Sequence, residues 1–244
     1  MRIAGLLLLV TILLPMPVRG ADDPSLADRM AMVGDIKRNV TRTERMTGIG
    51  EIDTRVLTAF ATVPRHIFVP PQLVPHAYAD TPLPLGFGQN LTQPFVAALM
   101  THLLGINPGD RVFETGTDTG FHAAILMEMG ARVFSVEIVE PLHAVARRLV
   151  EIQGYGRITL RLGDGYYGWA EHAPYDAMLI KESSASVPAA LLRQLKPGGR
   201  MVIPLGPPDG PQYLTLVRKD REGNIEQDAI LPVGFAPFQG GDRI

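Results

Sequence analysis

The central half of the chain alternates short apolar runs with segments of helical periodicity, and this alternation restricts the fold more than any other feature. Strands are predicted at residues 111–114, 131–136, 158–162, 175–180 and 199–204, and helices at residues 95–104, 120–129, 141–152 and 189–195. Strands separated by helices of about ten residues pair in parallel through right-handed crossovers. The pattern therefore predicts an α/β fold with a doubly wound, mostly parallel sheet.

The flanking regions follow different patterns. Residues 213–218 alternate, Gly223 and Asn224 indicate a turn, and residues 227–233 return as a strand, so an antiparallel hairpin is expected to complete the sheet. Residues 26–46 predict one amphipathic helix or two short ones, and residues 52–62 another helix.

Residues 64–94 combine proline, glycine and aromatic residues. This stretch is too irregular for regular elements yet too hydrophobic for a linker, and long ordered loops of this kind usually carry function. One domain is expected over residues 21–244, made of N-terminal helices and a substrate loop (21–94), a cofactor-binding core (95–210) and a C-terminal hairpin (211–244).

The first twenty residues predict a signal peptide. Arg2 precedes an unbroken apolar run over residues 3–14, and Pro15 and Pro17 follow it. The run is shorter than the roughly 20 residues that span a bilayer, and small residues near Gly20 suit cleavage after that residue. We therefore expect export, to the periplasm. The alternative is a cytoplasmic protein whose true start is Met30 or Met32.

Composition excludes several classes of function. The 23 basic and 25 acidic residues give a formal charge of −2, which does not favour nucleic acid as a partner. With no cysteine, thiolate nucleophiles, iron–sulfur clusters and disulfides are excluded. The six histidines show no ligand spacing, so no metal site is predicted.

Three turns at the ends of predicted strands contain glycine and acidic residues suited to ligand binding. The segment Asp110-Arg-Val-Phe-Glu-Thr-Gly-Thr-Asp-Thr-Gly-Phe-His122 places a glycine-bearing turn between a strand and a helix. Glu137 ends the next strand, at a spacing that suits a carboxylate bound to ribose hydroxyls, and Gly163-Asp-Gly165 ends a third strand. Because these turns share one edge of the sheet, they predict a nucleoside pocket bounded by Gly116, Glu137 and Asp164.

The absence of two common motifs limits which nucleoside cofactor the pocket can bind. No GxGxxG triplet is present to cradle a pyrophosphate, which argues against NAD and FAD, and no P-loop motif is present for ATP. A nucleoside cofactor without a pyrophosphate fits S-adenosylmethionine.

At this point the chain resembles the protein-L-isoaspartate (D-aspartate) O-methyltransferase family, a class I methyltransferase family with a Rossmann-like sheet. The similarity runs from about residue 53 to residue 240. It rests on six segments: Val63-Pro-Arg-His-Ile-Phe-Val-Pro70, Ala77-Tyr-Ala-Asp80, Leu83-Pro-Leu-Gly86, Gly88-Gln-Asn-Leu-Thr-Gln-Pro94, Gly163-Asp-Gly165 and Leu195-Lys-Pro-Gly-Gly-Arg-Met-Val-Ile-Pro204.

The resemblance implies methyl transfer from S-adenosylmethionine to the α-carboxyl of L-isoaspartyl residues in damaged proteins or peptides, a repair reaction. It places Thr92 at the position of the family's active-site serine. It implies a substrate side made by Tyr78, Asp80, Gln89 and Asn90, and a cofactor side made by Glu114, Gly116, Thr117, Gly120, Glu137, Asp164 and Gly165. The alternative for Tyr78 and Asp80 is a pair that stabilises the loop.

The chain departs from the family pattern at two places. Asp118 replaces the middle glycine of the family's Glu-Ile-Gly-Thr-Gly-Ser-Gly-Tyr-Gln, which adds a negative charge and strains any positive φ. Lys181 and Glu182, in Ile180-Lys-Glu-Ser-Ser184, stand where the family has a small, largely apolar Thr-Ala-Ala stretch, and they would alter the pocket or pair with each other. Two functions follow, an active repair methyltransferase or an exported, non-catalytic binding protein on the same scaffold with a degenerate cofactor site.

Overall fold

The computed structural model describes residues 23, 25–207 and 209–240, so the predicted signal peptide lies outside the described residues. Within the described part, the main sheet has the strand order β5-β4-β3-β6-β7-β8-β9. The five parallel strands are β3 (Arg111–Thr115), β4 (Arg132–Glu137), β5 (Thr159–Leu162), β6 (Tyr175–Leu179) and β7 (Leu195–Leu205). The antiparallel strands β8 (Gln212–Lys219) and β9 (Ile225–Val233) complete the sheet, as the alternation and the Gly223-Asn224 turn predict. The predicted α/β fold is confirmed.

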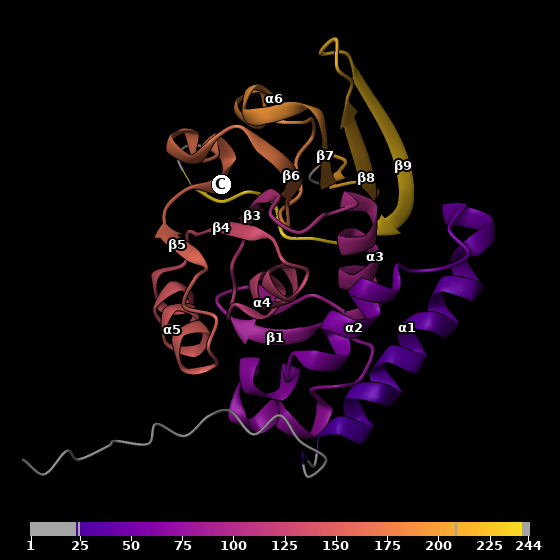
Figure 1. The fold of residues 1–244 in the computed structure, drawn as a ribbon, viewed down its shortest axis with the longest axis vertical. Coiled ribbons are helices and arrows are strands. Elements are labelled where there is room, and N and C mark those ends of the chain that lie inside the picture. The colour runs from indigo at the N-terminus through magenta and orange to yellow at the C-terminus, as the bar shows by residue number, and fades with distance from the viewer. Residues whose placement is uncertain (1–22, 24, 208, 241–244) are drawn as a thin grey trace, which may run out of the picture.

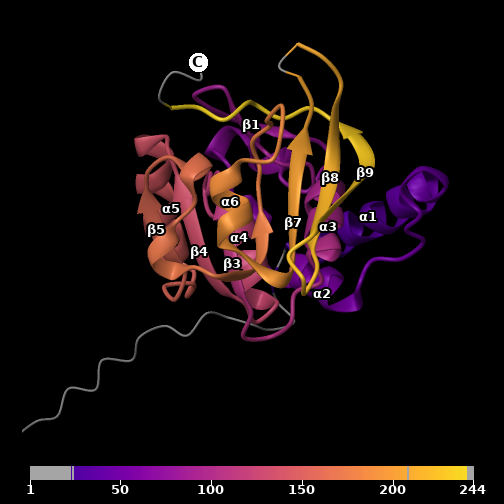
Figure 2. The same ribbon diagram turned by 90° about the horizontal axis from the view of Figure 1, so that it is seen from above.

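Helices cover both faces of the sheet (Figures 1 and 2). One face carries α3 (Pro94–Leu104), α4 (Phe121–Glu128) and α5 (Glu140–Ile152), and the other carries the short α6 (Ala189–Gln194) with the 3-10 turns η3 (Gly165–Tyr167) and η4 (Ala170–His172). Strand β3 therefore has a hydrophobic core on each of its faces. Val112 and Phe113 are both fully buried but pack into different cores, because successive strand residues point to opposite faces of the sheet.

The N-terminal region is more regular than the sequence predicts. Residues 26–46 form one helix, α1 (Leu26–Thr47), which lies against α2 (Thr54–Thr62) and α3 (Figure 1). The loop over residues 64–94 contains the 3-10 turns η1 (Arg65–Phe68) and η2 (Pro71–His76) and a hairpin of β1 (Leu83–Gly86) and β2 (Gln89–Leu91). The expectation that this stretch has no regular elements is therefore wrong.

The hairpin turn explains the missed prediction. Its two turn residues, Phe87 and Gly88, have φ of 55° and 72°, which is the left-handed backbone that a tight two-residue turn requires. Phenylalanine is an unusual residue in that conformation, so nothing in the sequence marks the turn. The hairpin is part of the predicted substrate loop and places Gln89 and Asn90 at the carboxyl ends of the parallel strands.

After β9 the chain turns back across the carboxyl ends of the parallel strands. In Figure 2 this yellow segment crosses one end of the main sheet, on the side where β1 lies. It is held by main-chain hydrogen bonds from Ser183 N–H to the Ala236 carbonyl (2.8 Å) and from Phe238 N–H to the Ser183 carbonyl (3.1 Å). Among the described helices, none combines the length and the apolar character needed to cross a membrane.

Candidate functional site

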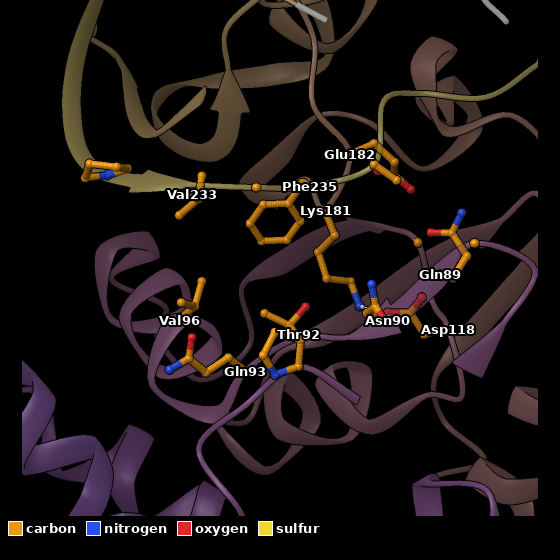
Figure 3. Close-up of a pocket in the computed structure, with 16 residues that line it drawn as sticks. Gln89, Asn90, Thr92, Gln93, Val96, Asp118, Lys181, Glu182, Val233 and Phe235 are labelled. Atoms are coloured by element: carbon orange, nitrogen blue, oxygen red, sulfur yellow. Dashed lines mark hydrogen bonds and ion pairs between the residues drawn. The ribbon is translucent and has the colours of Figure 1, made fainter. Parts of the chain in front are cut away.

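Two hollows open at the carboxyl ends of β3, β4 and β6, where ligands bind in open α/β sheets. The larger is a cleft of about 370 Å³ between the β1–β2 hairpin and the segment after β9 (Figure 3). The smaller is a crevice of about 20 Å³ that includes Glu137, Asp164 and Gly165. Gln89, Gly116 and Glu182 line both hollows, so the two form one continuous site.

The substrate loop supplies four polar side chains to the cleft. That of Gln93 is bound to Asp80, and the other three are those of Gln89, Asn90 and Thr92. Figure 3 shows them beneath the segment that carries Val233 and Phe235. Within the described ranges, none of these three side chains has a hydrogen-bond partner, so their amide and hydroxyl groups are available to a ligand. The apolar Val96, Val233 and Phe235 complete the walls and limit the access of water.

Arg65, which the sequence analysis gave no role, fixes the position of Thr92. Its side chain is fully buried, and it donates to the carbonyls of Ala77 and Thr92, both at 2.9 Å. The guanidinium also lies 4.8 Å from the centre of the Phe121 ring. Burial lowers the pKa of Arg65 to about 9, which still leaves it charged at neutral pH. Arg65 therefore connects the substrate loop to the core.

Tyr78 and Asp80, predicted on the substrate side, do not line the cleft. The Tyr78 hydroxyl contacts His66 Nδ1 at 2.6 Å. The Asp80 carboxylate accepts hydrogen bonds from Asn39 Nδ2 (2.6 Å), Gln93 Nε2 (2.9 Å) and the Phe95 main-chain N–H (2.8 Å). These contacts correspond to the alternative role, in which both residues stabilise the loop.

A buried ion network lies under the cleft. The Lys181 ammonium is 3.0 Å from Glu114 Oε1 and 3.2 Å from Asp118 Oδ2, and each of the three side chains is at most 8% exposed. Burial disfavours the ammonium, but the two carboxylates outweigh this effect and raise the pKa of Lys181. Lys181 thus neutralises the extra charge of Asp118. It pairs with Glu114 and Asp118, and not with Glu182 as the sequence had suggested.

Asp118 adopts the positive φ that its position requires of a glycine. Its φ is 57°, in the left-handed region, where aspartate is tolerated better than most residues. Its main-chain N–H donates to Glu137 Oε2 at 2.8 Å, and the Val139 N–H donates to Glu137 Oε1 at the same distance. The strained turn therefore helps to orient the carboxylate predicted to bind ribose.

Glu182 stands where the cleft meets the crevice. One carboxylate oxygen accepts a short hydrogen bond from the Thr115 hydroxyl. The other lies 2.8 Å from the place that a Cβ on Gly116 would take. Gly116 has a φ of 63°, in the left-handed region that favours glycine. Burial raises the pKa of Glu182 to about 8, and the neighbouring Glu137 carboxylate contributes to the rise.

The predicted cofactor residues divide into two groups. Gly116, Glu137, Asp164 and Gly165 line the crevice, as expected for a nucleoside pocket. The other three lie behind it: Glu114 is bound by Lys181 and Ser135, the Thr117 hydroxyl contacts Ser135 at 2.6 Å, and Gly120 leaves room for Val150. Glu114, Thr117 and Gly120 therefore shape the turn without facing the ligand.

The crevice is narrow because the segment after β9 covers it. Pro237, Phe238 and Gln239 form one of its walls, and the Phe238 ring packs edge-on against Tyr166 at 5.4 Å. The nucleoside end of the site is thus closed in this structure, while the cleft beside Thr92 is open.

Comparison with known proteins assigns the chain to a family. The family model described as protein-L-isoaspartate (D-aspartate) O-methyltransferase matches residues 36–243. The chain belongs to this family. The match begins inside α1, earlier than the resemblance predicted. Curated relatives named protein-L-isoaspartate O-methyltransferase include one from Cupriavidus necator, 44% identical over 95% of this chain and 89% of the relative, and one from Polaromonas sp., 46% identical over 86% and 99%.

Solved structures agree with the family fold. A protein-L-isoaspartate O-methyltransferase superimposes with a TM-score of 0.74 at 27% identity, over 87% of this chain and 66% of that one. A second, from Plasmodium falciparum in complex with S-adenosyl-L-homocysteine, gives a TM-score of 0.72 at 20% identity, over 86% of this chain and 98% of that one. At that identity the second match shows the fold alone.

The residues of the site fit the family's cofactor, S-adenosylmethionine, in their chemistry. Five carboxyl groups and one ammonium meet at this sheet edge; they are those of Glu114, Asp118, Glu137, Asp164, Glu182 and Lys181. Burial raises the pKa of Glu182 to about 8 and that of Glu137 to about 7, and a cation bound beside them would favour their ionised forms. Carboxylates at strand ends are also suitable acceptors for ribose hydroxyls and for an amino group. The space differs between the two ends, because the crevice of about 20 Å³ is much smaller than a nucleoside, whereas the cleft has about 370 Å³.

The raised pKa of Glu182 gives a testable pH dependence. Its folded pKa, about 8, lies above the ordinary value of 4.5, so between these pH values the folded state holds more protons than the unfolded state. The free energy of unfolding contributed by this group therefore falls as pH rises from 4.5 to 8. The groups that face Glu182 are Thr115, Glu137, Lys181 and Asp118.

Glu182→Gln is expected to unfold with a free energy about 1–2 kcal/mol higher than the unaltered chain at pH 8.5, with the difference vanishing near pH 4.5. Urea denaturation at both pH values measures this. Glu151→Gln, which removes an exposed carboxylate on α5, is the control and should be neutral at both. A difference that does not grow with pH would show that Glu182 is ionised at neutral pH.

Proposed function

We propose that this chain transfers the methyl group of S-adenosylmethionine to the α-carboxylate of L-isoaspartyl residues in proteins or peptides. The observation that carries the proposal is the set of three unpartnered polar side chains, Gln89, Asn90 and Thr92, facing a cleft continuous with the carboxylate-lined crevice. The relatives' names support the same activity.

The cofactor, when bound, supplies an electrophilic methyl group on a sulfonium. Glu137 and Asp164 are the residues that would hold its nucleoside, and Gly116 permits a close approach to the backbone. A substrate carboxylate is already a nucleophile and needs no general base. The remaining task of the protein is to orient it and exclude water, with the Thr92 hydroxyl as donor and Phe235 and Val233 as the apolar wall.

Two measurements test the proposal in sequence. Isothermal titration with S-adenosylmethionine is expected to show binding, and an isoaspartyl peptide is then expected to yield a methyl ester, measured by methanol release. The alternative is an exported, non-catalytic binding protein on the same scaffold with a degenerate cofactor site. The absence of heat at millimolar S-adenosylmethionine would favour that alternative, and cofactor binding without methyl transfer would place the fault in the substrate cleft.

Thr92→Val is expected to lower kcat/KM for an isoaspartyl peptide about tenfold, because it removes one hydrogen bond to the substrate carboxylate while keeping the shape of the side chain. Thr92→Ser retains the hydroxyl and should stay near the unaltered value. Initial rates of methanol release measure both. Equal activity of the valine and serine variants would remove Thr92 from the site.

We further propose that residues 1–20 direct the protein out of the cytoplasm, to the periplasm. Arg2, the apolar run over residues 3–14 and the small residue Gly20 support this proposal. N-terminal sequencing of the protein purified from its native cells tests it, with a mature chain that starts at Ala21 as the expected result and a chain that starts at Met1, Met30 or Met32 as the contrary one.

A further inference from the structure

The Glu182 side chain lies on the path between the two hollows. It lines both of them, together with Gln89 and Gly116, and Figure 3 shows its carboxylate beside Gln89 at one end of the cleft. A ligand that reaches from Glu137 in the crevice to Thr92 in the cleft must pass this carboxylate. This inference rests on the proposed function, which requires such a ligand.

The chemistry of that ligand places its charge at the junction. With the nucleoside in the crevice and the methyl group presented to a carboxylate at Thr92, the sulfur that joins them passes the junction. Transfer forms the carboxyl O–CH₃ bond and breaks the S–CH₃ bond, and the electron pair of that bond stays on sulfur. The cationic sulfonium thus becomes a neutral thioether next to Glu182.

The other acidic groups at this edge are less suited to sense the change. Glu114 and Asp118 already share the Lys181 ammonium as a counter-ion, at 3.0 and 3.2 Å. Both oxygens of Glu137 accept main-chain N–H groups. Glu182, in contrast, receives a hydrogen bond from the neutral Thr115 hydroxyl, and no cationic side chain in the described part of the chain forms an ion pair with it.

We infer that Glu182 is a specificity-determining residue whose carboxylate binds the sulfonium of S-adenosylmethionine in preference to the uncharged thioether of S-adenosylhomocysteine. The loss of this attraction after transfer favours release of the spent cofactor. The family's small side chain at this position has no charge to offer, so the property belongs to this chain.

The protonation of Glu182 supports the inference. Its pKa of about 8 leaves the carboxyl largely protonated at pH 7 when no cation is near, and a sulfonium beside it lowers that pKa. The charged groups that face it are Glu137 on β4, Asp118 in the turn after β3 and the adjacent Lys181. Burial also raises the pKa of Glu137 to about 7, but Glu137 would meet the same nucleoside in both ligands. Binding of S-adenosylmethionine at pH 7 should therefore release more protons than binding of S-adenosylhomocysteine.

The test compares dissociation constants for the two ligands in the unaltered chain and in Glu182→Gln, by isothermal titration at pH 8. The glutamine keeps the shape and an acceptor for Thr115. We expect its preference for S-adenosylmethionine over S-adenosylhomocysteine to fall about tenfold, with the S-adenosylhomocysteine constant nearly unchanged. Glu151→Gln on α5 is the matched control and should leave both constants within about twofold.

A second readout is the proton count, obtained from titrations at pH 7 in two buffers of different ionisation enthalpy. The extra proton release with S-adenosylmethionine, relative to S-adenosylhomocysteine, should disappear in Glu182→Gln. If both ligands bind and the preference is the same in the two proteins, this inference is overturned and the proposed function stands. If neither ligand binds the unaltered chain, the proposed function and the inference fail together.

Discussion

Lys181→Met is expected to lower the free energy of unfolding by about 3–5 kcal/mol at pH 7.5, because it leaves two buried carboxylates without their shared counter-ion. Glu114 is fully buried and Asp118 is 6% exposed, so neither can turn to solvent. The loss should shrink at pH 5, since burial raises the pKa of both carboxyls and acid neutralises them. Chemical denaturation at the two pH values measures the effect.

The control is Lys196→Met, which breaks an ion pair with Asp176 in which the lysine side chain is 53% exposed, and it should cost about 0.5 kcal/mol. A rescue variant combines Lys181→Met with Asp118→Gly. Removing one carboxylate and the left-handed aspartate together should restore part of the stability, which measures the coupling between the two positions. A loss for Lys181→Met no larger than that for Lys196→Met would show that the network is not buried in solution.

Arg65→Met is expected to lower the free energy of unfolding by about 2–4 kcal/mol, because the carbonyls of Ala77 and Thr92 lose their buried donor. In the protein that remains folded, kcat/KM for an isoaspartyl peptide should fall about a hundredfold, since displacement of the substrate loop by about 1 Å carries a cost of this size. The fall should appear in kcat as well as KM, because Thr92 would be misplaced in the transition state.

The comparison for Arg65→Met is Arg55→Met, a change on the exposed side of α2 where Arg55 pairs with Asp53. It should leave both stability and kcat/KM nearly unchanged. Arg65→Lys can donate to only part of the two-carbonyl arrangement and should fall between the two. If the Arg65→Met protein is folded and fully active, the position of the substrate loop does not depend on the hydrogen bonds that Arg65 donates to Ala77 and Thr92.

The strands and helices of the main sheet could be predicted because each has a clear period and a clear end. Val112 and Phe113 alternate between two cores, and the Gly223-Asn224 turn marks the final hairpin. The β1–β2 hairpin could not be predicted, since its turn depends on Phe87 at a φ of 55°, a conformation that phenylalanine rarely adopts.

The sequence predicted which residues at the strand ends form the site, but it did not predict the contacts that these and other side chains make. Gly116, Glu137 and Asp164 meet at one crevice because parallel strands end at one edge. Asp118 and Lys181 stood out singly as departures from the family, but their pairing joins residues 63 positions apart and needs the fold to be seen. The covering of the crevice by Phe238 had no signal in the sequence.

The contact between Asp118 and Lys181 also has an evolutionary consequence. An ancestor with glycine and threonine at these positions has no charge at either. Lysine gained at 181 alone would still pair with Glu114, whereas aspartate gained at 118 alone would leave a buried ion unmatched. We therefore expect aspartate at 118 only in relatives that carry a cation at 181, with the lysine gained before the aspartate or together with it. An alignment in which aspartate at 118 occurs freely without a cation at 181 would contradict this history.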